Sequence, residues 1–133
     1  MANALFDAGR ENILGGDIDW DAANIKTNLL DGADYTRNIA TDNALDDIPS
    51  AARVATSGNL TSKTKTGGTA DAADVTWTAV TGDPCEMVGH HKDSGVESTS
   101  FLICNHDTST GLPITPNGAD INLIYNASGI FKI

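Results

Sequence analysis

The chain has 133 residues and a formal net charge of −10, from 18 acidic and 8 basic side chains. A chain of this length suits one domain with a modest core. Its negative charge disfavours phosphate backbones and anionic membrane surfaces, so we expect neither nucleic acid nor a membrane as a partner. Gly, Asp, Asn, Ser and Thr are abundant, whereas Gln is absent and Glu is rare. This composition favours a turn-rich β fold over a helical bundle.

The amino-terminal end of the sequence predicts a helix. In residues 3–14 apolar side chains recur at a spacing of three to four, and Gly15-Gly16 is a stop signal. We therefore expect residues 1–16 to form a short helix or docking arm. Its large apolar side chains must be covered either by the chain's own sheet or by a neighbouring molecule. The candidate interface residues are Leu5, Phe6, Arg10 and Ile13.

Residues 17–133 are expected to form a single β domain. Alternating apolar and polar residues predict a first strand pair within 17–30, before a turn at Asp31-Gly32. A single helical turn is expected near Pro49, with Asp42 or Asn43 as its N-cap. Further strands are expected in 53–66, 73–80, 85–93, 100–107, 121–126 and 129–133, with 85–93 and 100–107 forming a hairpin. About seven or eight short strands at near-regular spacing fit an antiparallel β-sandwich or a small barrel.

The predicted hairpin gathers residue types that bind zinc, which are Cys85, His90, His91, Cys104 and His106. Register decides which of them share a face of the sheet. If the numbers of opposed residues sum to an odd value near 193, Cys85, His91, Cys104 and His106 share a face, whereas an even sum groups His90 with Cys104 and His106. We expect the odd-sum register.

Two further observations weigh against a metal in this hairpin. No short-range spacing resembles a zinc knuckle, and cysteine is commonly a plain buried hydrophobe. The sequence also has no apolar window of about 18 residues and no signal-peptide pattern, which favours the reducing cytosol and free thiols at Cys85 and Cys104. We therefore expect no metal and no other cofactor.

The remaining motifs give little sign of catalysis. Asp occupies alternate positions from Asp17 to Asp21, but Ala22 and Asn28 replace the Gly and Glu that a calcium loop needs. The same alternation indicates a half-exposed strand. There is no G-x-S-x-G elbow and no phosphate-binding loop, so we expect no enzyme activity. A cytosolic enzyme that binds a metal through the histidines and cysteines of the hairpin is the less favoured hypothesis.

Four blocks of the sequence resemble, in the same order and spacing, a family of small virion proteins of tailed bacteriophages that are encoded among head and tail genes. The blocks are MANALFDAGRENILGGDIDW, DIPSAARVATSGNLTSKT, ADAADVTWTAVTG and TGLPITPNGADI, and together they extend over nearly the whole chain. Members commonly begin M-A-N-A-L-Y-D and carry A-D-A-A-D-V-T-F-T-A-V-T-G. The hairpin segments CEMVGHHKD and FLICNHD depart from the family pattern, which is aliphatic and carries tyrosine there.

The resemblance implies a structural role in the virion. Within that class we expect a capsid cement (decoration) protein at the capsid surface, bound to the shell of the major capsid protein as a homo-oligomer such as a trimer. The alternative is a tail-tube, tail-tip or head-to-tail connector component, in which the polar segment SKTKTGGTADAAD would complete a neighbour's sheet. A small acidic β domain without an active site suits either role.

Overall fold

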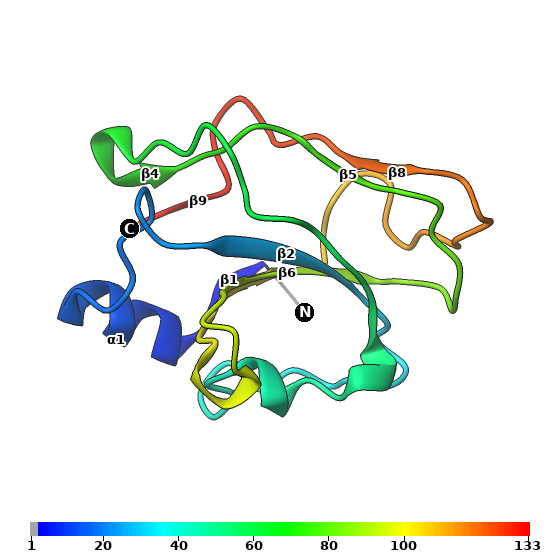
Figure 1. Ribbon diagram of the computed structural model, residues 1–133, viewed down its shortest axis with the longest axis horizontal. Coiled ribbons are helices and arrows are strands. Elements are labelled where there is room, and N and C mark those ends of the chain that lie inside the picture. The colour runs from blue at the N-terminus through cyan, green and yellow to red at the C-terminus, as the bar shows by residue number, and fades with distance from the viewer. Residues whose placement is uncertain (1–2) are drawn as a thin grey trace.

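A computed structural model describes residues 3–133 (Figure 1). Met1 and Ala2, which belong to the predicted segment 1–16, lie outside the described residues. The helices are α1 (Asp7–Gly15) and the 3-10 helices η1 (Leu45–Asp47), η2 (Ser50–Ala52), η3 (Thr66–Gly68) and η4 (Glu97–Thr99). The strands are β1 (Ala4–Leu5), β2 (Ile25–Leu30), β3 (Arg53–Thr56), β4 (Thr69–Ala70), β5 (Val75–Trp77), β6 (Met87–Lys92), β7 (Leu102–His106), β8 (Ile121–Leu123) and β9 (Phe131–Lys132).

The strands form one central sheet and two small ladders. The five-stranded sheet has the order β1-β7-β6-β2-β3, with every neighbouring pair antiparallel. The antiparallel pairs β4-β9 and β5-β8 form the ladders. In Figure 1 the ladders lie on one side of the central sheet, and α1, η1, η2 and η4 lie on the other. The fold is mainly β and sandwich-like, as predicted, and the strands of residues 3–133 do not close into a barrel.

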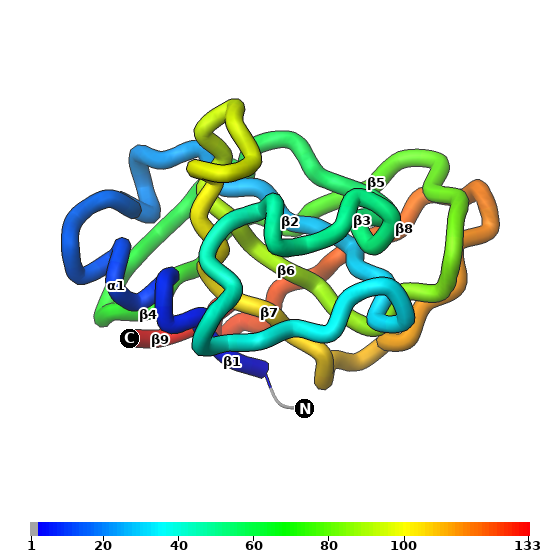
Figure 2. The backbone as a smooth tube through the Cα atoms, turned by 90° about the horizontal axis from the view of Figure 1, so that it is seen from below, coloured from blue at the N-terminus to red at the C-terminus, as the bar shows by residue number. Residues whose placement is uncertain are grey.

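A separate hydrophobic core fills each side of the central sheet. Alternate side chains of β2 enter the two cores, because successive residues of a strand face opposite ways. Ile25 and Leu29 pack in the core beneath the ladders, which also holds Trp77 of β5. Leu30 packs in the core on the helical side with Ile48. Figure 2 views this helical side, where the segment between β2 and β3 runs across the strands.

The amino-terminal segment is built into the sheet. β1 is an edge strand that pairs Leu5 with Cys104 of β7, and Phe6 is 1% exposed in the helical-side core. The predicted start of the helix at residue 3 is wrong, because residues 4–5 are extended and α1 begins only at Asp7. Its predicted end is confirmed, since Gly16 has a left-handed φ of 84° and its N–H donates to carbonyls of the last turn.

Several other local expectations are corrected. Residues 17–21 contain no strand, although Ile18 and Trp20 are buried and the aspartates around them are exposed. No strand pair therefore forms within 17–30, and β2 pairs instead with β3 and β6.

Between β2 and β3, two 3-10 helices replace the single predicted turn. Ala44 is the N-cap of η1, in place of Asp42 or Asn43, and Pro49 is the N-cap of η2. The predicted strand of residues 53–66 is also shorter than expected, because β3 ends at Thr56. The described chain has nine strands instead of about seven or eight, and three of them, β1, β4 and β9, have only two residues each.

Candidate functional site

The hairpin of β6 and β7 brings three potential metal ligands together. The hairpin itself is as predicted, but the odd-sum register is wrong over most of its length. Val88 pairs with His106 and His90 with Cys104, which is the even-sum alternative. A bulge next to His90 then shifts the pairing by one residue, so that His91 pairs with Leu102. Opposed residue numbers therefore sum to an odd value only from His91 onward, beyond the three potential ligands.

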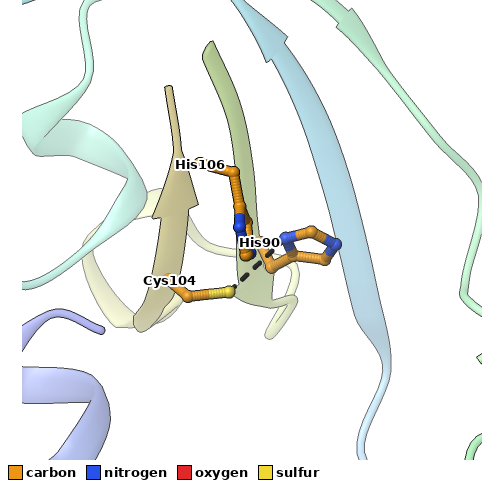
Figure 3. A group of neighbouring side chains, drawn as sticks. All are labelled: His90, Cys104 and His106. Atoms are coloured by element: carbon orange, nitrogen blue, oxygen red, sulfur yellow. Dashed lines mark hydrogen bonds between the residues drawn. The ribbon is translucent and has the colours of Figure 1, made fainter. Parts of the chain in front are cut away.

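His90, Cys104 and His106 consequently lie on the face of the sheet that carries the ladders. Figure 3 shows their three side chains close together on the two strands. Cys104 is directly opposite His90, and His106 is its diagonal neighbour. His90 Nδ1 lies 3.5 Å from Cys104 Sγ. The two imidazole rings meet edge to face, with centroids 5.7 Å apart. One potential ligand atom from each of the three residues lies within 4.8 Å of those of the other two.

Tyr125 holds the ring of His90 from the other side. The second ring nitrogen of His90, Nε2, lies 2.8 Å from the Tyr125 hydroxyl oxygen. Tyr125 follows β8, and its backbone N–H donates to Asp74 Oδ1 at 2.9 Å. The contact between His90 Nε2 and the Tyr125 hydroxyl fixes the orientation in which His90 presents Nδ1 to Cys104.

Burial keeps the three potential ligands uncharged at neutral pH. It lowers the pKa of His90 to about 3, with smaller contributions from the neighbouring histidines. It also lowers the pKa of His106 and raises the pKa of the Cys104 thiol. His106 Nε2 is buried and has no hydrogen-bond partner among the described residues. The cluster therefore consists of three uncharged potential metal ligands, and one of their nitrogen atoms, His106 Nε2, lacks a hydrogen-bond partner among the described residues.

A cleft of 1040 Å³ opens beside this cluster. One wall is formed by β1 and by the hairpin, including His90, Cys104 and His106. The C-terminal segment around Tyr125 and Phe131 also lines it. The cluster thus lies at the boundary between the core beneath the ladders and this cleft.

Cys85 and His91 lie outside the cluster. Cys85 is fully buried, pairs its backbone with Ile114, and has a thiol pKa raised by burial to about 12. His91 follows His90 in β6 and so faces the helical side, where its Nδ1 lies 2.7 Å from Asn28 Oδ1. Burial lowers the pKa of His91 to about 4. Both cysteines are free thiols in the structure.

Asn28 links His91 to the sheet edge, and this link predicts a stability change. Its Nδ2 donates to Thr56 Oγ1 at 2.7 Å, and Asn28 is 1% exposed. Thr56→Val keeps the shape of the side chain but leaves the buried amide without this acceptor. We expect the free energy of unfolding to fall by about 1–3 kcal/mol in urea denaturation.

Thr76→Val is the matched control for that substitution. Thr76 Oγ1 donates to Asn122 Oδ1 at 2.8 Å at an exposed position of the β5-β8 ladder. Water can replace this bond, so we expect a change within about 0.5 kcal/mol. Equal losses in the two variants would contradict the role given to Asn28.

The predicted interface residues fall into buried and exposed groups. Phe6 is a core residue and is not available to a partner in this fold. Leu5 and Ile13 are partly buried against the chain's own core. Arg10 is exposed and forms an ion pair with Asp7 at 2.8 Å. No sequence signal marked Leu14, which is 82% exposed at the end of α1.

Among the alternating aspartates from Asp17 to Asp21, which partly match a calcium loop, two contact a basic side chain of the same chain. Lys65 Nζ lies 3.3 Å from carboxylate oxygens of both Asp19 and Asp21. The Lys65 ammonium lowers the pKa of Asp19. This run therefore forms an exposed ion-pair group.

Comparison with protein-family models and with curated proteins finds no match to this chain. Within residues 3–133, no helix has both the length and the apolar character needed to cross a bilayer.

Proposed function

We propose that the chain is a bacteriophage virion structural protein, and within that class a capsid cement (decoration) protein. The observation that carries the proposal is the ordered set of four sequence blocks described above, from MANALFDAGRENILGGDIDW to TGLPITPNGADI. Its partner is the major capsid protein of the same phage. The chain binds the assembled shell in many copies, as a homo-oligomer such as a trimer where capsid subunits meet.

The charge of the chain supports a particular kind of contact. A protein with a net charge of −10 gathers densely on a shell only if basic groups of the shell lie opposite it. We expect charge pairs at the rim of each contact and apolar anchors at its centre. Each contact is modest, and copy number multiplies its effect because a ligand of the assembled state stabilises that state by mass action.

The exposed side of α1 is the part of the amino-terminal segment that suits such a contact. Arg10 and Leu14 are exposed there, with one charged and one apolar side chain. Phe6, Leu5 and Ile13 then act indirectly, by holding α1 against the sheet. Because deletion of the segment would remove Phe6 from the core, surface substitutions are the appropriate probes.

Particles without the protein test the proposal. For a phage genome that encodes this chain, we expect deletion of the gene to leave heads that assemble but release DNA at a lower temperature than wild-type heads. Purified chain added to those heads restores their stability, and its affinity falls as salt rises. The measurement is DNA release on heating, followed by dye fluorescence.

Variants of the purified chain, added to heads that lack the protein, supply the controls. Arg10→Ala is expected to restore heads less well than Lys65→Ala, which makes the same change in charge at another exposed ion pair. If heads without the protein have ordinary stability and instead lack tails or fail to join them, the cement assignment is wrong. The chain would then be a tail-tube, tail-tip or connector component.

A further inference from the structure

We propose that His90, Cys104 and His106 bind one divalent cation of the zinc class, with a fourth coordination position open to the cleft. This site is independent of the proposed role in the virion, because it lies within a single chain. The sequence groups these three residues only in the even-sum register, whereas we expected the odd-sum register and no metal. In the structure, the even-sum pairing of β6 with β7 brings the three residues together.

The donor set selects the class of metal. Two imidazole nitrogens and one thiolate are ligands for borderline and soft cations such as Zn²⁺, and for Co²⁺ as its common substitute. Ca²⁺ and Mg²⁺ require oxygen ligands, and the cluster of His90, Cys104 and His106 offers none. We therefore expect discrimination against both hard cations.

The spacing of the donors matches a tetrahedral centre. With a metal–sulfur bond of about 2.3 Å and a metal–nitrogen bond of about 2.0–2.1 Å, a tetrahedral angle places nitrogen and sulfur about 3.6 Å apart. The distance between His90 Nδ1 and Cys104 Sγ is 3.5 Å. His106 lies at the diagonal position beside them, where a small ring movement brings its nitrogen to the same centre.

Tyr125 provides the outer contact that metal-binding histidines generally have. For His90 Nδ1 to bind a metal, its Nε2 must carry the proton, and Nε2 is the atom that lies 2.8 Å from the Tyr125 hydroxyl. The tautomer needed for metal binding is thus the one that can donate to Tyr125.

The present contacts leave the cluster incompletely satisfied. His106 Nε2 is a buried polar atom without a hydrogen-bond partner among the described residues, and such an atom destabilises the fold. When the cation binds, a metal–sulfur bond forms at Cys104 and the thiol proton passes to solvent. All three ligands are among the residues that line the cleft, which gives the cation a path to the cluster.

Cobalt titration tests the site on the full-length chain after removal of metal by a chelator. We expect one Co²⁺ per chain, with a sulfur-to-cobalt charge-transfer band and the intense visible bands of four-coordinate cobalt. Zn²⁺ should displace the cobalt and abolish both signals, whereas Ca²⁺ and Mg²⁺ should not. Native mass spectrometry measures the stoichiometry independently.

Matched variants assign the ligands. Cys104→Ser should abolish the charge-transfer band, whereas Cys85→Ser, which alters the other buried cysteine, should retain it. His106→Gln, which removes a ligand, should weaken binding more than about 100-fold. Tyr125→Phe, which removes the outer contact of His90, should weaken it by about 10–100-fold. Circular dichroism of each metal-free variant identifies any that does not fold, and the half-buried His106 provides the test if Cys104→Ser unfolds.

Two results would overturn the proposal. One is a wild-type chain that binds no cobalt in molar excess. The other is a charge-transfer band that survives in folded Cys104→Ser or is lost in folded Cys85→Ser. Neither result depends on whether the chain binds a capsid.

Discussion

Replacing Ile103 by alanine is expected to lower the free energy of unfolding by about 2–5 kcal/mol. Ile103 is 0% exposed and belongs to the core beneath the ladders. The substitution removes buried apolar atoms and leaves a cavity. The backbone of α1 packs directly on this part of β7, where a Cβ placed on Gly9 would lie 2.6 Å from Ile103 O.

Ile124→Ala is the control for that loss. It makes the same chemical change at a side chain that is 75% exposed, just after β8. We expect its free energy of unfolding to stay within about 0.5 kcal/mol of the wild-type value. Urea denaturation of the two variants measures both free energies. A loss at Ile124 as large as that at Ile103 would contradict the assignment of Ile103 to the core.

Gly9→Ala is expected to destabilise the protein by about 1–3 kcal/mol or more, although alanine is the better helix former. The new Cβ would lie 2.6 Å from Ile103 O, 2.9 Å from Ile103 Cα and 2.9 Å from Leu102 O. All three atoms belong to the backbone of β7, so no side chain can rotate away to relieve the contact. The helix must move off the strand instead.

Gly15→Ala separates this clash from helix propensity. Gly15 is in the last turn of α1, and the nearest atom to an added Cβ is Asp17 Oδ2 at 3.4 Å, which is an ordinary contact. We expect this variant to gain up to about 1 kcal/mol, because alanine has less backbone freedom to lose than glycine. Thermal and urea unfolding compare the two variants. A stabilised Gly9→Ala protein would show that α1 does not pack on β7 as described.

The α1-β7 contact also bears on the proposed metal site. β7 carries Cys104 and His106, and β1, the strand just before α1, pairs directly with Cys104. A helix displaced by Gly9→Ala would therefore disturb the strand that holds two of the three ligands. The tightness of this packing is one reason for expecting the ligands to be held in place before a metal binds.

Several local features were predictable from sequence because they depend on neighbouring residues. The hairpin of β6 and β7 followed from two alternating segments separated by the polar run DSGVEST. The end of α1 followed from glycine, which tolerates the left-handed conformation found at Gly16. The burial of Ile18 and Trp20 also followed from alternation, even though that segment is not a strand.

The register of the hairpin was not predictable, for a physical reason. β6 is buried on both faces, with Val88 and His90 toward the ladders and Met87 and His91 toward the helices. A hydrophobic pattern specifies register only where one face is buried and the other is polar. Both registers therefore satisfied the sequence, and the choice between them decided whether His90 or His91 meets Cys104.

By itself, the sequence determined the β class, the hairpin and the presence of Cys104 and the three histidines on its two strands, because composition, alternation and turn residues act over short distances. Cys85, which was also expected on the hairpin, lies just before β6. The tertiary structure alone decided that β1 joins the edge of β7, that β2 lies between β3 and β6, and that Tyr125 reaches His90. These contacts join segments far apart in the chain. Their stability comes from mutual burial of both partners, which no local pattern of residues encodes.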